Sequence, residues 1–271
     1  MPEGSSRDAI TFPRRRKKYP RLPDQINVEF GPGDVIGQAI LALYYGAREQ
    51  GVYLSLSTDL SELVAFNATN PPGWFQLRPM FDADLSGIRA NHAFWLRGID
   101  DDDNIVLTHC GRLYALPPSS SLHDELENLR FFYKEPQRQK TPGETCVAES
   151  TDLTSVTGRI VFGGAHWIHP RMRGRGLAYF APRTTRAIGL TTWYTDFAAS
   201  MAKASMVARG IDATYGWTHV DRGVVTWNRP AAGETLDYKF GWMTRDEVIT
   251  DLERFTLLLR SGVDRSKVFA I

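Results

Sequence analysis

Hydrophobic residues recur along this 271-residue chain with two different periods. In some segments they return every three or four positions, which places them on one face of an α-helix. In others they alternate with polar residues or form short β-branched runs, a pattern typical of β-strands. The predicted helices cover 36–51, 60–64, 122–132, 197–209, 245–255 and a segment beginning at 177. The predicted strands cover 52–56, 93–97, 105–109, 158–168, 188–194, 215–220 and 224–227.

Polar side chains mark the start of several predicted helices. Asp34 precedes one apolar repeat, and Thr58 or Asp59 precedes the next. A side-chain oxygen there can accept hydrogen bonds from the first free N–H groups. Thr244 and Glu247 have the spacing of a capping box, which opens the last helix. That helix serves either internal packing or contact with a second copy in a homodimer. Pro182 is expected to kink or shorten the helix that begins at residue 177.

Two short polar segments predict hairpin turns. Asp100–Asn104 joins the strands at 93–97 and 105–109, and Asp221–Gly223 joins those at 215–220 and 224–227. The run of four aspartates also suggests calcium. It lacks the glycine at position six and the glutamate at position twelve of an EF-hand loop, so a solvated turn is favoured and no metal site is predicted.

The order of these elements predicts an α/β fold of the α+β type, with a mixed sheet. We expect a single domain over residues 25–243, preceded by a disordered basic tail at 1–24 and followed by a C-terminal helical extension at 244–271. The tail carries seven Arg and Lys against two acids within residues 1–22, and its run Arg14–Lys18 suggests weak nucleic-acid contact.

Composition narrows the class of protein further. Hydrophobic residues make up 42% of the chain, enough for a sizeable core, and the net charge of +1 does not demand an acidic partner. The two cysteines, Cys110 and Cys146, form neither a disulfide framework nor a zinc pattern, which suits a reducing cytoplasm. We expect no membrane span and no secretory signal. The composition therefore indicates a cytoplasmic globular protein.

The stretch His166–Ala178 carries the strongest functional signal. A predicted strand leads into a turn that contains two glycines and three arginines, and a predicted helix follows. The free N–H groups and the dipole at a helix N-terminus attract anions, glycine lets the backbone approach a phosphate, and arginine adds charge-assisted hydrogen bonds. The pattern predicts a phosphate or pyrophosphate site, and the alternative is an Arg/Gly-rich surface turn.

Two common phosphate motifs do not fit this turn. A Walker A loop requires a lysine that is absent, and a dinucleotide-binding fingerprint would need glycine where Tyr179 stands. The segment Arg173-Gly-Arg-Gly176-Leu-Ala178, with Ile168-His-Pro170 before it, resembles the acetyl-CoA loop of the Gcn5-related N-acetyltransferases. A frame starting at Arg171 also has the right spacing. The resemblance covers residues 35–228 and implies the acyl-CoA N-acyltransferase fold, with a sheet that splays beside the phosphate strand and the thioester in the cleft.

The resemblance implies an acyl-CoA-dependent N-acyltransferase that uses acetyl-CoA or another acyl-CoA as co-substrate. Its acceptor would be a small-molecule or peptide amine. The co-substrate would contact Trp167, Ile168, Arg171, Arg173, Gly174, Arg175, Gly176, Leu177 and Ala178.

The chemistry requires a proton acceptor for the amine and a proton donor for the leaving thiolate. On the phosphate strand His166 is the titratable candidate, unless it is only a hydrogen-bonded histidine at a strand end. In the family, a later helix often supplies a tyrosine and an asparagine, and the matching positions here are Met206 and Ala199. Tyr194 and Tyr215 are the substitutes for the donor. These departures leave open a non-catalytic acyl-CoA-binding protein, and the basic tail leaves open a nucleic-acid-associated one.

Overall fold

A computed structural model describes residues 18–261, and positions 1–17 and 262–271 lie outside the described part of the chain. The strands are β1 Tyr53–Ser57, β2 Ala93–Ile99, β3 Ile105–Ala115, β4 Thr145–Ala148, β5 Arg159–Ile168, β6 Phe197–Lys203, β7 His219–Val220, β8 Val225–Arg229 and β9 Glu234–Thr244. The helices are α1 Gly33–Glu49, α2 Leu60–Ala68, α3 Ala83–Ser86, α4 Leu122–Glu127, α5 Pro136–Gln139, α6 Leu177–Trp193, α7 Ala204–Val207, α8 Ile211–Tyr215 and α9 Arg245–Arg260.

The strands form one mixed sheet in the order β1-β2-β3-β5-β6-β9-β8-β4, with β7 paired to β9. Every pair is antiparallel except β5 with β6, which run parallel across the centre of the sheet. The hairpin predicted from 93–97 and 105–109 is confirmed as β2 and β3. The predicted mixed α/β fold is therefore the observed one.

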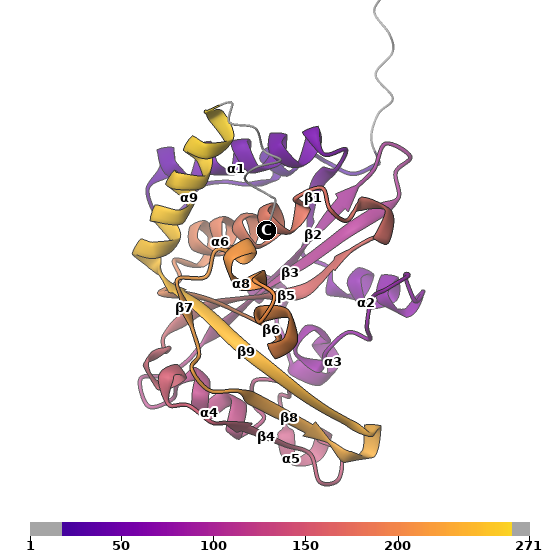
Figure 1. Ribbon diagram of the computed structural model, residues 1–271, viewed down its shortest axis with the longest axis vertical. Helices are drawn as coiled ribbons and strands as arrows, with labels where there is room; N and C mark the ends of the chain where they lie inside the picture. Colours follow the sequence, from indigo (N-terminus) through magenta and orange to yellow (C-terminus); the bar gives the residue numbers. More distant parts are fainter. Residues whose placement is uncertain (1–17, 262–271) are drawn as a thin grey trace, which may run out of the picture.

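Two hydrophobic cores lie on opposite faces of this sheet. One joins α1, α6 and α9 to the sheet, and Figure 1 shows these three helices grouped on the same side. The other is rich in aromatic side chains and includes residues of α2, α4, β4 and β8. The apolar face of α9 is therefore used inside the chain against α1, which is the packing role predicted for it, and its homodimer role stays a prediction.

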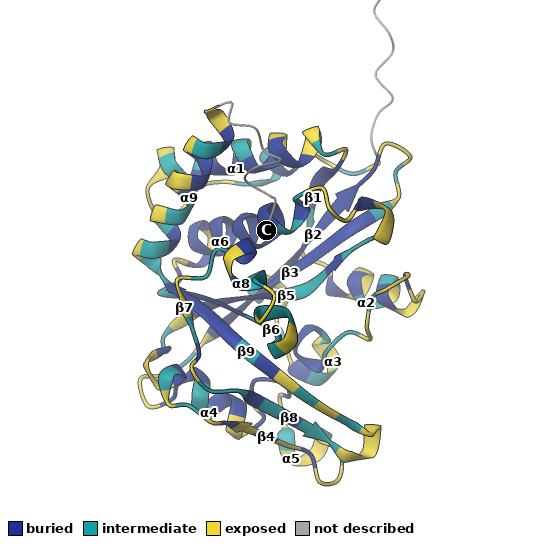
Figure 2. Ribbon diagram, in the orientation of Figure 1, coloured by how far each residue is buried: buried dark blue, intermediate teal, exposed yellow. Residues whose placement is uncertain are grey.

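Helix α6 is buried on nearly every side, as Figure 2 shows by its dark colour along most of its length. The predicted strand at 188–194 is wrong, because those residues continue α6. Buried arginines and threonines interrupt the apolar positions of α6, so the sequence does not show a simple helical period there. Pro182, the sixth residue of α6, lies inside the helix without ending it, although it lacks the N–H that would donate to the Ala178 carbonyl.

The predicted helix at 197–209 is also wrong. Residues 197–203 form β6, which inserts between β5 and β9 with its small alanines buried. Alanine has the highest helix propensity, an advantage of about 0.5 kcal/mol per residue over most other residues. Pairing with strands on both sides outweighs this preference. The predicted second hairpin is wrong as well, because β7 and β8 each pair with β9, a strand the pattern did not predict.

Helix ends agree only in part with the predicted caps. The capping box of Thr244 and Glu247 is confirmed, as is Asp59, whose carboxylate accepts from the Ser61 N–H at 2.8 Å. Asp34 does not cap α1, which begins after Pro32 without a side-chain cap. The helix predicted at 122–132 ends earlier, at Glu127, and Leu129 then adopts φ +60°.

Part of the segment predicted as a disordered tail, residues 1–24, packs on the folded domain. Positions 1–17, including most of Arg14–Lys18, lie outside the described residues. Leu22, however, is completely buried in the core that contains α1 and begins a short 3₁₀ turn, η1 (Leu22–Gln25). The Tyr19 ring also lies 4.4 Å from the Arg97 guanidinium. Residues 19–24 therefore belong to the folded domain.

Replacing Leu22 with alanine should lower the free energy of unfolding by about 2–4 kcal/mol, because the side chain leaves a cavity in a packed core. Urea unfolding followed by circular dichroism measures the change. The matched control is Leu41→Ala on α1, whose side chain is 42% exposed, and it should change the value by less than about 0.5 kcal/mol. Equal midpoints for the two variants would show that the segment does not pack as described.

Within residues 18–261, no helix has the length and apolar character needed to cross a membrane.

Candidate active site

The central strands β5 and β6 pair over only part of their length. They are in register from Ile160 with Phe197 to Gly163 with Ser200, and beyond that point no pairing continues. Ala165 adopts φ +49°, and the register between β5 and β3 shifts at the same place, so β5 bulges there. The edge of β5 from 164 to 168 that faces β6 is therefore open to a ligand.

A cavity of about 740 Å³ occupies this opening. At one end it is lined by Met172 and Leu177, which belong to the core around α6. At the other end Phe81, Phe162 and Tyr238 line it, and these belong to the aromatic core on the opposite face. The cavity therefore passes between the two strands from one face of the sheet to the other.

The predicted phosphate turn lies at the mouth of this cavity. Strand β5 ends at Ile168, a 3₁₀ turn (η5, Pro170–Met172) follows, and α6 begins at Leu177. Gly174 and Gly176 have φ of +73° and +71°, a region in which glycine is strongly preferred. Gly176 is the N-cap of α6 and no side chain caps the helix, so its first N–H groups are available to an anion.

The three arginines of the turn have different partners. The Arg173 side chain lines the cavity and donates from Nε to the Ile168 carbonyl at 3.1 Å. The Arg175 guanidinium points instead to the Gln50 carbonyl, 3.5 Å away. The Arg171 guanidinium pairs with the Asp100 carboxylate and lies outside the cavity lining. Arg173 is thus the arginine placed to meet a ligand, and Arg171 joins the turn to the β2–β3 hairpin.

The Trp167 side chain, which we expect to contact the co-substrate, forms part of the cavity wall. It is buried, stacks on Trp74 with ring centroids 5.5 Å apart, and donates from Nε1 to the Pro72 carbonyl at 3.1 Å. The segment Gly73–Arg78 lines the cavity beside it. The sequence pattern did not reveal this segment, although the Asn70-Pro-Pro-Gly73 break marks where it begins.

His166 lies in the cavity wall between two other ring side chains. Its ring is 5.2 Å from that of His109 and 5.6 Å from that of Tyr215, centroid to centroid. Both ring nitrogens are buried, and neither makes a hydrogen bond of normal geometry within the described residues. The pKa of His166 is lowered to about 4 because burial removes solvation from the imidazolium, and the Thr108 backbone offsets only part of that loss. His166 is therefore neutral at pH 7.

His109 lies deeper, between β3 and α6. Its Nδ1 is 2.8 Å from the Thr185 hydroxyl, and burial, with His166 and Arg186 nearby, holds the pKa of His109 well below its usual range. The two rings are thus a pair of neutral, buried imidazoles.

The pKa shift of His166 predicts a loss of stability in acid. The folded protein resists protonating this ring, so the unfolded chain binds more protons between pH 6.5 and about 4, and stability falls as the pH drops through that window. From pH 7 to pH 5 the loss from His166 should be about 2 kcal/mol. Urea unfolding of the wild type and of His166→Gln at both pH values measures it. Equal losses in the two proteins would contradict a neutral buried His166.

The two tyrosines proposed as proton donors lie in different places. Tyr215 ends α8, lines the cavity and is 6% exposed, and burial raises the pKa of its phenol. Tyr194 is outside the cavity, at the far end of α6, where its ring packs against Phe30 and under the Arg245 guanidinium. The structure therefore does not bring Tyr194 to the cavity, because α6 separates it from the turn.

The expected placement of Ala199 and Met206, the positions matched to the family's asparagine and tyrosine, is also wrong. Both were placed on one helix, but Ala199 is on β6 and Met206 is on the single turn α7. Met206 nevertheless lines the cavity. Tyr215, on the helix that follows, is the hydroxyl-bearing side chain that approaches His166.

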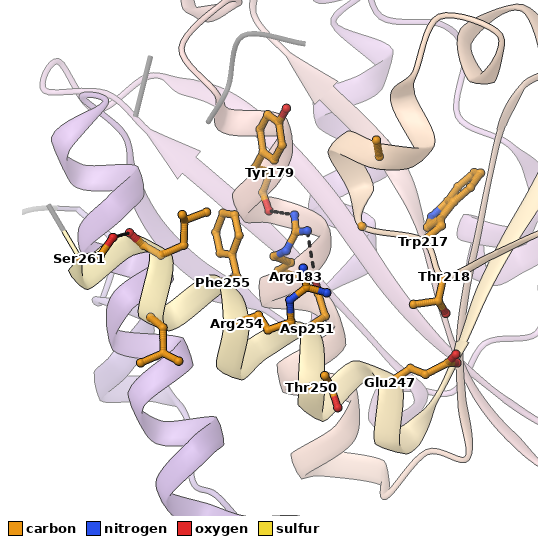
Figure 3. A pocket seen from close by; sticks show the side chains of 14 residues that line it. Tyr179, Arg183, Trp217, Thr218, Glu247, Thr250, Asp251, Arg254, Phe255 and Ser261 are labelled. Atoms are coloured by element: carbon orange, nitrogen blue, oxygen red, sulfur yellow. Dashed lines mark hydrogen bonds and ion pairs between the residues drawn. The ribbon is translucent and has the colours of Figure 1, made fainter. Parts of the chain in front are cut away.

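A second cavity of about 850 Å³ lies between α6, α8 and α9. Figure 3 shows Arg183 there between Tyr179 and Asp251; its guanidinium donates to the Tyr179 carbonyl at 3.1 Å and to the Asp251 carboxylate at 3.0 Å. Arg186 binds the same carboxylate at 2.8 Å and the Tyr215 carbonyl at 2.7 Å. These contacts hold α8 and Tyr215 against α6, and they pair Arg183 with Asp251 in the wall of the second cavity.

Within residues 18–261 no group of three or more potential metal ligands comes together.

The similarity of this chain to known proteins lies among solved structures. No family model and no curated protein matches the chain. Among solved structures it is similar to the spermidine/spermine N-acetyltransferase SpeG of Vibrio cholerae, with 12% identity, 73% of this chain and 97% of that one covered, and a TM-score of 0.40. It is also similar to an acetyltransferase of Acinetobacter baylyi (13%; 72% and 93%; 0.43) and to RimJ of Mycobacterium smegmatis solved with CoA-disulfide (12%; 77% and 90%; 0.41).

Proposed function

We propose that this protein is an acyl-CoA-dependent N-acyltransferase that acts on an amine. The observation that carries the proposal is the opening between β5 and β6, which leads directly to the uncapped N-terminus of α6. A pyrophosphate suits the amides and Arg173 at the turn, while the amide-bearing pantetheine arm suits the open edge of β5. Coenzyme A carries both groups at the matching ends.

The reaction proposed is direct attack of the amine nitrogen on the thioester carbonyl carbon. A C–N bond forms, the C–S bond breaks, and the amine loses one proton while the thiolate gains one. The neutral imidazole of His166 accepts the proton from nitrogen, whose acidity rises as it bonds to the carbonyl, so a base of low pKa suffices. The phenol of Tyr215, kept protonated by burial, donates to the sulfur.

The test is release of free coenzyme A thiol from acetyl-CoA, with and without amines of different charge. Amine-dependent thiol release, with the acetylated amine seen by mass spectrometry, is the expected result. Binding of acetyl-CoA without any transfer would favour a non-catalytic acyl-CoA-binding protein. Retention on DNA that weakens with salt and is lost on removal of residues 1–17, without acyl-CoA binding, would favour nucleic-acid association.

A further inference from the structure

The end of the cavity opposite the phosphate turn has its own chemistry. We call it the acceptor end and define it by Phe75, Gln76, Arg78, Met201, Lys203 and Tyr238, all of which line the cavity. Coenzyme A bound along β5 from the turn would bring its acyl group toward this end. A second substrate would therefore enter between the segment 75–78 and strands β6 and β9.

The acceptor end is cationic. Lys203, at the end of β6, has no acidic partner among the described residues, and its ammonium lies 4.3 Å from the centroid of the Phe75 ring. The Arg78 guanidinium is 3.3 Å from the Glu234 carboxylate, which Arg229 also contacts at 3.0 Å, and Arg229 lies 4.0 Å from the Glu144 carboxylate. Lys203 therefore supplies the positive charge of this end that no carboxylate of the described residues balances. No aspartate or glutamate of residues 18–261 lines the cavity. A polycationic amine would meet repulsion there without a carboxylate to bind it.

The same end is also apolar and aromatic. The Phe75 ring is 66% exposed although it lies beside the cavity, and the buried Tyr238 ring forms the wall contributed by β9. Exposed aromatic rings next to a cavity supply contact area for an apolar ligand. The acceptor end thus offers an apolar surface together with a positive charge that lacks a carboxylate partner.

From this combination we infer that the acceptor is a small amine with an aromatic or apolar body and a carboxylate, that is, an amino acid of this kind. Its amine would face the opening between β5 and β6, and its carboxylate would meet the Lys203 ammonium. The inference rests on the proposed function, because it names the substrate class of the same site. It disfavours polyamines as acceptors.

The test compares L-phenylalanine with phenethylamine, which lacks only the carboxylate, and with spermidine, using acetyl-CoA as donor. The wild type should prefer phenylalanine, with spermidine the slowest. In Lys203→Met the ratio of kcat/KM for phenylalanine to that for phenethylamine should fall about tenfold or more, since a charge-assisted contact is lost. The matched control is Lys140→Met, an exposed lysine outside the cavity, which should leave the ratio as in the wild type.

An unchanged ratio in Lys203→Met, or a preference for spermidine, would overturn the inference while leaving acyl transfer intact. Binding gives a second measure: N-acetyl-L-phenylalanine should bind the coenzyme A complex about tenfold more weakly in Lys203→Met. If coenzyme A binds but neither phenylalanine nor its acetylated form is recognised, the acceptor class is wrong. If coenzyme A itself does not bind, the proposed function is wrong, and the inference about the acceptor is wrong with it.

Discussion

Coenzyme A should bind at least a hundredfold more weakly when Gly176 is replaced by valine. Gly176 has φ +71° and is the N-cap of α6, so its conformation aims the first N–H groups of the helix at the ligand. A β-branched residue strongly disfavours this conformation and adds bulk where the pyrophosphate would approach. Two lost hydrogen bonds to a charged group, at about 1.5–3 kcal/mol each, account for a loss of this size.

Calorimetric titration of coenzyme A into the wild type and the variant measures the effect. The matched control is Gly233→Val in the β8–β9 turn, where φ is +64° and an added Cβ would have no atom within 4 Å. It carries similar backbone strain at a residue that does not line the cavity or belong to the turn before α6, so it should bind coenzyme A as the wild type does. If Gly176→Val binds equally well, the phosphate is held elsewhere.

Removal of the Tyr215 hydroxyl should lower kcat about a hundredfold or more and leave the KM for acetyl-CoA nearly unchanged. Tyr215→Phe keeps the ring against His166 and Trp217 but loses the hydroxyl that we propose as proton donor for the thiolate. General acid catalysis contributes about 10²–10⁴-fold, so the chemical step should slow by that order. Single-turnover thiol release separates this step from binding.

Tyr194→Phe is the matched control for this measurement. Its ring is 45% exposed at the far end of α6, so the variant should react like the wild type. Comparable rates for Tyr215→Phe and the wild type would mean that the thiolate takes its proton from another source, with water in the cavity as the alternative.

The turn between β5 and α6 could be predicted because its signals are local, and its binding of phosphate stays a prediction. Gly174 and Gly176 report the positive φ that the turn requires, and β5 before it has a clear strand composition. The opening beside β5 is not local. It depends on where the pairing with β6 stops, and the alanines of β6 predict helix until the neighbouring strands are considered. Its splayed shape was therefore implied by the family resemblance rather than by the pattern of residues.

The residues of the candidate site also differ in how far local sequence signals predict them. His166 could be found because it is the titratable side chain on the phosphate strand, whereas its loss of hydrogen-bond partners depends on packing against His109 and Tyr215. Tyr215 was named on a predicted strand and is on α8 instead, held there by Arg186 from α6. Lys203 was not identified, because its place at the cavity follows from the junction at which β6 ends and α7 begins.

The most direct test of the central claim is an experimental structure of the protein with coenzyme A bound. The account predicts the pyrophosphate within hydrogen-bond distance of the N–H groups of residues 174–178, with Arg173 beside it. It predicts the pantetheine arm along residues 164–168 of β5, in the opening toward β6. Coenzyme A in the cavity between α8 and α9, or no bound ligand at saturating concentration, would contradict it.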